Sequence, residues 1–236
     1  MKVIAIAAVT AGGKTTIVNE LKNQIANTKA LYFDDYSFEG EVDNFYEWTK
    51  QGADYNVWNL SPLVEDVIDI KNSDCEYLLL DYPFAYCHKA LRNYIDCAIF
   101  IDTPLDIAMA RKVLRDMKNA TGEEIRQEME TYLKYARIAY VQMLKDILPS
   151  SDYVIDGTKE LSEKVDEIKD YFIAIALICQ SGLSLEGVMK LKIETDRLVI
   201  RSIQYGDEKS FAEMAQDGSL EAIGFDCNCS EWIEDW

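Results

Sequence analysis

The chain has 236 residues, 49% of them hydrophobic, which is enough to bury the core of one large domain or of one domain with an appendage. Its 42 acidic side chains outnumber its 24 basic ones and give a formal net charge of −18, which argues against a nucleic-acid partner because the phosphate backbone would be repelled. The apolar stretch Tyr171–Cys179 is too short to span a bilayer, so no membrane partner is expected.

A glycine-containing loop follows the first apolar run of the chain. The run, Val3–Ala7, predicts a strand, and a helical pattern over Thr15–Gln24 comes after the loop. Strand, loop and helix N-terminus in this order suit phosphate binding, because the loop amides and the positive end of the helix dipole face the anion. The alternative is an ordinary Gly-Gly turn with an exposed lysine, which the flanking strand and helix disfavour.

The loop follows the phosphate-binding pattern G-x-x-x-x-G-K-[ST] except at its first position, where Ala8 replaces glycine. Alanine is tolerated there if its φ is negative. We expect Lys14 to bridge the β- and γ-phosphates of a nucleoside triphosphate and the Thr15 hydroxyl to ligate Mg²⁺. The predicted nucleotide-binding residues are Ala11, Gly12, Gly13, Lys14, Thr15 and Thr16.

Strand and helix patterns alternate from the loop to residue 172. Apolar runs predict strands at Ala30–Phe33, Glu76–Asp81, Cys97–Asp102 and Tyr153–Asp156, and helical patterns predict helices at Pro62–Ile70, Thr103–Met117, Glu123–Leu148 and Leu161–Phe172. Ser61 is a candidate cap for the first of these helices, and residues 36–59 are expected to be irregular. The alternation predicts an α/β fold in which helices cover both faces of a parallel sheet.

Acids at the ends of these strands are candidates for catalysis and metal binding, since ligands of parallel sheets bind at the carboxyl edge. Asp34 or Asp35 could take a proton from an acceptor hydroxyl, although a surface turn acid or a helix cap would give the same pattern. Asp81 could hold Mg²⁺, or could simply cap its strand.

Arginines are candidates for neutralising a transferred phosphoryl group in this acidic chain. Arg111 and Arg115 share one helix face at spacing i, i+4, which favours a phosphate clamp over solvated arginines paired with acids. For Arg126, on the next helix, the two interpretations are even. Arg137 lies further along the same helix and is assigned to acceptor binding.

Aromatic side chains between residues 36 and 58 are the remaining candidates for acceptor binding. Tyr36, Tyr55 and Trp58 could stack on a base or simply close a small cap. His88, the only histidine, follows the third strand, where an acceptor could lie, but a lone histidine is more often structural. Asp35 is added to this predicted acceptor-binding set.

Four stretches within residues 1 to about 172 resemble the uridine kinase and nucleoside kinase branch of the P-loop kinases. They are Ile4–Thr16; Phe33–Tyr36, similar to the Q-D-[SD]-[FY] loop of that family; Ala110–Asp116, similar to its R-R-x-x-R-D lid helix; and Tyr132–Arg137 with Ser151–Ile155, similar to its Y-x-x-x-x-R and A-D-x-[IV]-[IV] segments. The resemblance implies a P-loop NTPase-type three-layer αβα fold with a five-stranded parallel sheet, and Mg·ATP as phosphoryl donor. It also implies Asp34 as the base for a nucleoside 5′-hydroxyl and Arg111 and Arg115 as lid arginines.

The chain departs from that family at two motifs, and its region before residue 60, where the base would be contacted, is not recognisably that of a uridine kinase. Asn119–Glu123 stands where the family has a lid ending E-R-G-R, and Asp81–Phe84 replaces a strand-end E-G. ATP-dependent transfer to a small-molecule hydroxyl, with a nucleoside as the first candidate acceptor, is therefore better supported than uridine itself. A non-catalytic nucleotide-binding module and a kinase of a sugar or vitamin remain the alternatives.

The C-terminal part is expected to be separate from a kinase domain at residues 1–172. Residues 173–192 are predicted as a linker helix and 193–236 as an extension. Ile193–Arg201 and Gly206–Ala215 resemble the opening strand and helix of GNAT-type acetyltransferases, but the coenzyme A loop of those enzymes does not follow. The extension could be a remnant, a truncated fusion, or a packing element that forms a homo-oligomer. Scattered cysteines and an N-terminus that begins directly with a strand favour the cytoplasm.

Overall fold

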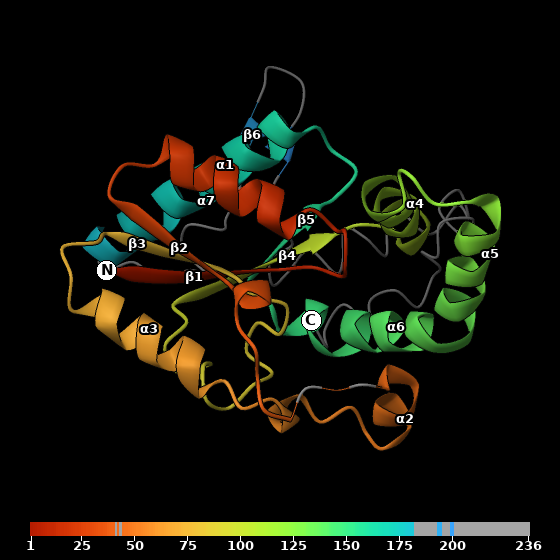
Figure 1. The fold of residues 1–236 in the computed structure, drawn as a ribbon. Coiled ribbons are helices and arrows are strands. Elements are labelled where there is room, and N and C mark those ends of the chain that lie inside the picture. The colour runs from red at the N-terminus through yellow and green to blue at the C-terminus, as the bar shows by residue number, and fades with distance from the viewer. Residues whose placement is uncertain (41, 43, 182–192, 195–198, 201–236) are drawn as a thin grey trace, which may run out of the picture. The chain divides into compact units, whose positions relative to one another are not determined.

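A five-stranded parallel sheet organises the first part of the chain (Figure 1). In the computed structural model, which describes residues 1–40, 42, 44–181, 193–194 and 199–200, the strands follow the order β2-β3-β1-β4-β5. Their bounds are β1 (Lys2–Ala7), β2 (Thr28–Tyr32), β3 (Tyr77–Asp81), β4 (Cys97–Asp102) and β5 (Tyr153–Asp156). The predicted α/β class and five-stranded parallel sheet are confirmed.

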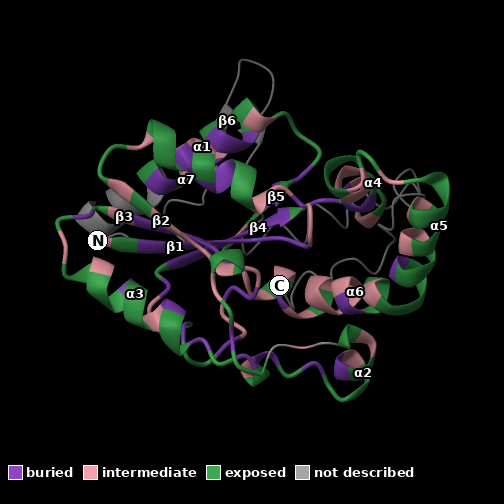
Figure 2. Ribbon diagram, in the orientation of Figure 1, coloured by how far each residue is buried: buried purple, intermediate pink, exposed green. Residues whose placement is uncertain are grey.

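Helices cover both faces of this sheet, as expected when parallel strands are buried on both sides (Figures 1 and 2). On one face lie α1 (Lys14–Gln24) and the first part of α7 (Leu161–Ser181), where Lys169 donates a hydrogen bond to Gln24 over 3.0 Å. On the other face, alternate strand residues share one hydrophobic cluster with α3 (Ser61–Lys71) and α6 (Arg137–Asp146). The three-layer αβα arrangement is therefore confirmed.

The strand register brings four connecting segments to one edge of the sheet. Asp81 at the end of β3 pairs with Ile6 of β1 and with Tyr32 of β2, so the loops after β1 and β2 leave beside it. Asp102 and Asp156 pair in the same way at the ends of β4 and β5. This carboxyl edge is where ligands of open α/β sheets bind.

Residues 36–59 contain more regular structure than their sequence predicts. Helix α2 (Phe45–Lys50) is capped by Asn44, whose side chain accepts a hydrogen bond from the Glu47 N–H, and a 3₁₀ turn follows at Tyr55–Val57. A helix of six residues is too short to show a helical period. The prediction that Ser61 caps the next helix is wrong. Ser61 is the first residue of α3, and the Asn59 side chain accepts hydrogen bonds from the N–H and the hydroxyl of Ser61.

The single helix predicted at Glu123–Leu148 is two helices joined by a π turn. Helix α4 (Leu105–Asp116) precedes them, α5 (Gly122–Thr131) opens with a capping box formed by Thr121 and Glu124, and the π turn occupies Tyr132–Ala136. The π turn shifts the buried face of the helix, so Leu133, which continues the three- and four-residue apolar spacing of the sequence, is exposed. Tyr132, within the turn, is buried.

The chain divides into two compact units, residues 1–169 and 170–236. Helix α7 continues past the predicted end at Phe172 to Ser181. Further on, β6 (Ile193–Glu194) and β7 (Val199–Ile200) pair antiparallel, where the sequence predicts one continuous strand. Gly206–Ala215, the second acetyltransferase-like stretch, and residues 182–192 of the expected linker lie outside the described residues. None of the helices that the structure describes has the length and apolar character to cross a membrane.

Candidate active site

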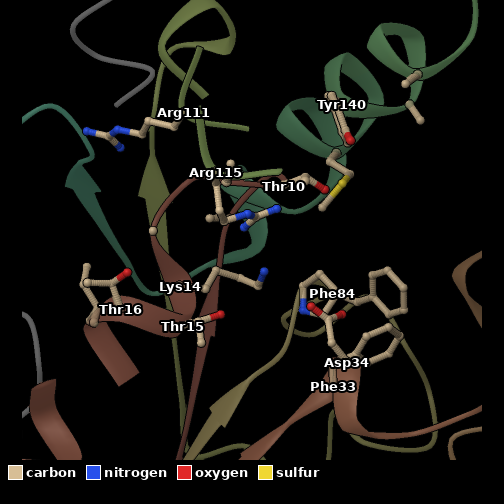
Figure 3. A pocket seen from close by; sticks show the side chains of 18 of the residues that line it. Thr10, Lys14, Thr15, Thr16, Phe33, Asp34, Phe84, Arg111, Arg115 and Tyr140 are labelled. Carbon is tan, nitrogen blue, oxygen red and sulfur yellow. The ribbon is translucent and has the colours of Figure 1, made fainter. Parts of the chain in front are cut away.

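A cavity of about 680 Å³ lies at the carboxyl edge of the sheet in the first unit. Its walls come from the loop after β1, the segment after β2, α2 and the turn at Tyr55–Val57, α4, α6 and the loop after β5. Figure 3 shows Arg111 and Asp34 on opposite sides of this cavity, with Lys14 and Arg115 between them in that view. We call the Arg111 side the donor end and the Asp34 side the acceptor end.

The loop after β1 is bent by two residues with positive φ, Ala11 at 57° and Gly13 at 106°. The Gly12 N–H donates a hydrogen bond to the Val9 carbonyl over 2.9 Å, which closes the bend. A Cβ at Gly12 would lie 2.7 Å from the Cβ of Ala8 and 2.8 Å from the Val9 oxygen, so only glycine fits there. Ala8 is not among the residues with positive φ, so the alanine that breaks the expected pattern sits without strain.

Thr103, at the start of the segment that leads to α4, ties this loop to the rest of the edge. Its buried hydroxyl donates a hydrogen bond to the Gly12 carbonyl over 2.9 Å. Gly157 packs against the same side chain so closely that a Cβ there would lie 1.9 Å from the Thr103 Oγ1 atom. The loops after β1, β4 and β5 therefore hold one another in place. The Thr103-Pro104 pair predicts only a helix start, so this role of Thr103 could not be predicted from the sequence.

Lys14, Thr15 and Asp81 form a polar group at the N-terminus of α1. The Lys14 Nζ atom lies 3.5 Å from Asp81 Oδ1, and the Thr15 hydroxyl donates a hydrogen bond to Asp81 Oδ2. A hydroxyl and a carboxylate side by side are oxygen ligands of the kind that Mg²⁺ takes when phosphates and waters supply the rest, so this pair fits the metal. In the part of the chain that the structure describes, no three His, Cys, Asp or Glu side chains gather as an all-protein metal cage.

Asp34 and Arg115 face the cavity from opposite walls. Asp34 is exposed in the 3₁₀ turn Phe33–Asp35 that directly follows β2. Arg115, on α4, is held by its neighbour Asp116 through two hydrogen bonds, 2.6 Å from Nε and 3.0 Å from Nη2. The hydrogen bond that Arg115 donates to Asp116 chiefly, and the charge of Asp34 more weakly, raise the pKa of Arg115. This guanidinium therefore stays cationic beside the Asp34 carboxylate.

The acceptor end is lined by packed rings. Phe84 lies 4.9 Å from Trp58 and 5.3 Å from Tyr55 between ring centroids, and Phe45 of α2 stacks on Trp58 at 6.5 Å. The polar atom of Tyr55 is turned into the protein, where its hydroxyl donates a hydrogen bond to Asp146 over 3.1 Å. Burial, with the charge of Asp146, raises the pKa of Tyr55. These side chains offer ring faces and uncharged edges to a ligand.

The structure brings most of the predicted site residues to this cavity. The lining residues among them are Ala11, Gly13, Lys14, Thr15, Thr16, Asp34, Tyr55, Trp58, Arg111 and Arg115. Gly12 and Asp81 do not line the cavity. The Gly12 carbonyl accepts a hydrogen bond from Thr103, and the Asp81 carboxylate accepts one from Thr15, which lines the cavity. The sequence did not single out Phe45, Phe84 or Lys164, which also line the cavity.

Four predicted acceptor-binding residues lie away from the cavity lining. Tyr36 stacks on Phe38, and its hydroxyl donates a hydrogen bond to Asp66 over 2.5 Å. Asp35 and Arg137 are exposed and do not line the cavity.

His88 is the fourth, and it is buried behind the aromatic wall. Its Nε2 atom bonds the Trp58 carbonyl over 3.0 Å. Arg126 likewise lies outside the cavity lining, where it pairs with Glu123. His88 thus contacts the cavity wall from behind and does not face the cavity.

Comparison with known proteins adds to this geometry. The family described as "Phosphoribulokinase / Uridine kinase family" matches residues 69–162. A uridine kinase from Borrelia duttonii (strain Ly) is 28% identical over 180 residues, which cover 66% of this chain and 86% of that protein. A uridine kinase from Staphylococcus aureus (strain JH9) is 25% identical over 179 residues, covering 65% and 86%.

Among solved structures, a gluconokinase from Sinorhizobium meliloti 1021 is similar with a TM-score of 0.46 and 14% identity, covering 76% of this chain and 97% of that one. The family match spans β3 to β5 of the parallel sheet, and the two similar relatives are both kinases. The chain is accordingly a small-molecule kinase.

Proposed function

We propose that this chain transfers the γ-phosphoryl group of Mg·ATP to a hydroxyl group of a nucleoside. The observation that carries the proposal is the content of one cavity, which joins a phosphate loop, the Asp34 carboxylate just after β2 and a wall of aromatic rings. Each of these suits one part of the reaction: the donor phosphates, the acceptor hydroxyl and the acceptor ring.

The donor phosphates are assigned to the loop after β1. Its amides and the N-terminus of α1 favour an anion, and the Lys14 ammonium, now 3.5 Å from Asp81, can turn to the β- and γ-phosphates. Thr15 and Asp81 would hold Mg²⁺, which when bound neutralises charge on the phosphate oxygens. Lys14 and Thr15 then exchange contacts with Asp81 for contacts with the nucleotide.

The transfer step is assigned to Asp34 and the two arginines of α4. Asp34 would accept the proton of the attacking hydroxyl, since its carboxylate is exposed to the cavity at the end of β2. Arg111 and Arg115 would neutralise negative charge that moves with the phosphoryl group. Arg115 suits this task because it lines the cavity and an arginine side chain stays cationic at any working pH.

The aromatic wall supports a ring-bearing acceptor. Phe45, Trp58 and Phe84 can stack on a flat ring, and the cavity-lining residues of α2 and α6 carry no charge. A nucleobase suits such a surface. The similarity to uridine kinases also supports a nucleoside as the acceptor. A vitamin with an aromatic ring and a free hydroxyl is the second candidate that this wall favours, ahead of an unadorned sugar.

The test is an acceptor panel with ATP consumption as the first readout. Purified chain, ATP and Mg²⁺ are mixed separately with nucleosides, sugars and hydroxyl-bearing vitamins, and products are identified by mass spectrometry. We expect phosphorylated product from a nucleoside, at its 5′-hydroxyl, at the highest kcat/KM of the panel. A higher kcat/KM for a vitamin or sugar would replace the acceptor assignment. Nucleotide binding without product from any acceptor would favour a non-catalytic nucleotide-binding module.

A further inference from the structure

Lys164, in the first turn of α7, is a buried lysine beside the donor end of the cavity. Only 6% of the residue is exposed. Its ammonium donates hydrogen bonds to the carbonyl of Lys159 over 2.7 Å and to the carbonyl of Gly157 over 3.3 Å. Both carbonyls belong to the loop between β5 and α7, residues 157–160, three of which line the cavity together with Lys164 itself.

A buried ammonium is costly unless it is well bonded, so its position calls for a reason. Among the described residues, Lys164 forms no ion pair with a carboxylate, and its ammonium bonds the two loop carbonyls. Burial, with the charge of Arg111 adding to it, lowers the pKa of Lys164, against a weaker opposing influence of Glu160 and Asp156. The Lys164 ammonium therefore holds the backbone of the 157–160 loop through these two carbonyls.

The Gly157 carbonyl also accepts a hydrogen bond from Arg111. The Arg111 Nη2 atom donates a hydrogen bond to the Gly157 oxygen over 3.2 Å, so a cation from α4 and a cation from α7 share one acceptor. Gly157 is in turn packed against Thr103, which bonds the phosphate loop at Gly12. A displacement of the 157–160 loop would therefore move the anchor on which the Arg111 guanidinium rests.

We propose that Lys164 is a positioning residue for the donor nucleotide: it fixes the 157–160 loop and, through the shared Gly157 carbonyl, holds Arg111 at the donor end of the cavity. The inference rests on the proposed function, because it requires that a nucleotide occupy this end. It gives Lys164 no contact with the reacting atoms. Its loss should weaken nucleotide binding and leave the acceptor end unchanged.

The first experiment measures Mg·ATP binding by calorimetry, and steady-state kinetics, for Lys164→Met. Methionine keeps the length and apolar stem but removes both charge-assisted hydrogen bonds. We expect the Kd for Mg·ATP to rise about tenfold and kcat at saturating ATP to change less than about threefold. The matched control is Lys169→Met on the same helix, a half-buried lysine outside the cavity that bonds Asp166 and Gln24, and its Kd should equal that of the wild type.

The second experiment asks whether Lys164 acts through Arg111. In a double-mutant cycle with Arg111→Ala, the tenfold cost of Lys164→Met should shrink to about twofold or less, because the guanidinium that it positions is gone. A merely structural lysine would cost the same in both backgrounds. A full tenfold cost in the Arg111→Ala background therefore overturns the proposal.

The remaining outcomes separate this inference from the proposed function. A folded Lys164→Met chain that binds Mg·ATP within twofold of the wild type overturns the inference alone. A wild-type chain that binds no nucleotide overturns the proposed function and the inference with it. If thermal melts show that Lys164→Met does not fold, Lys164→Gln is measured instead; it keeps an N–H donor without charge, and a Kd equal to the wild type then counts against the proposal.

Discussion

The two ends of the cavity are built from different materials. The donor end depends on backbone: a positive φ at Ala11 and Gly13, a Gly12 with no room for a Cβ, and loop carbonyls held by Thr103 and Lys164. The acceptor end depends on side-chain packing, in which aromatic rings from three segments meet. Few residue types can satisfy the first set of demands, whereas many combinations of rings could satisfy the second.

Charge separates the two ends as well. Lys14, Arg111, Arg115 and Lys164 line the cavity in a chain whose formal net charge is −18, so the phosphates of the proposed donor would meet a local cationic site on an acidic molecule. The rings of the acceptor end are uncharged. The comparison suggests that donor binding is set by a few irreplaceable positions and acceptor choice by the shape of a neutral wall.

The largest expected effect follows from removing the charge at the phosphate loop. Lys14→Ala should lower kcat by about 10³-fold, because the ammonium is the side-chain cation nearest the assigned phosphate site. Measurement of kcat with saturating acceptor and ATP tests this. Lys29→Ala, an exposed lysine on β2 that bonds Ser73, is the control and should keep wild-type turnover. Normal turnover in Lys14→Ala would remove the donor end from the proposed mechanism.

Asp34 tests the boundary between the two ends. Asp34→Asn should lower kcat by about 10²- to 10⁴-fold through loss of the proposed base, with the acceptor Kd unchanged because the side chain keeps its size. Asp35→Asn is the matched comparison, since Asp35 is exposed in the same turn but does not line the cavity. Equal losses in the two variants would mean that the turn, and not the Asp34 carboxylate, is needed.

The loop after β1 could be predicted from sequence because its demands are local, whereas Thr103 and Lys164, which also belong to the donor end, could not. A strand, a glycine pair, Lys14 and Thr15 follow one another within a few residues, and the backbone geometry that they imply is the geometry observed. The sheet could be predicted for a related reason, since each buried parallel strand is a short apolar run with its own boundaries. Once these strands pair in parallel, Asp81 lies level with the ends of β1 and β2.

The acceptor end could not be predicted in the same way. Tyr36 and Phe84 are both aromatic residues close to a strand end, yet Tyr36 turns to Asp66 while Phe84 packs on Trp58, and only tertiary contacts decide between them. Helix α2 has six residues and no period to detect. Lys164 reads as one more lysine on a helix, and its burial comes from the loop folded over it. These features are non-local.

A milder effect is expected at the aromatic wall. Phe45→Ala should raise the acceptor KM about tenfold through loss of one ring contact, while the KM for ATP stays unchanged. Phe45 is 44% exposed, so its truncation should cost little stability. Tyr46→Ala, on the same helix but packed on Tyr135 and Lys50, is the control. A rise in the KM for ATP instead would contradict the division between the two ends.

The smallest expected effect concerns His88, which supports the acceptor wall from behind. Because Nε2 bonds the Trp58 carbonyl, it carries the proton, and Nδ1 accepts a hydrogen bond from the Ala90 N–H over 3.1 Å. A proton added at Nδ1 would break that second bond. Burial chiefly, with Lys89 adding to it and Asp54 opposing it, lowers the pKa of His88 below its ordinary value of 6.5.

The sign of the pH effect follows from that lowered pKa. Below about pH 6.5 the unfolded chain takes up a proton that folded His88 resists, so the free energy of unfolding should fall as the pH drops from 7 to 5. No other histidine titrates in this window, and His88→Gln, which keeps an N–H donor toward Trp58 but cannot titrate, should show a flatter dependence. Urea unfolding at pH 7, 6 and 5 measures both slopes, and identical slopes would show that the buried imidazole does not couple the acceptor wall to pH.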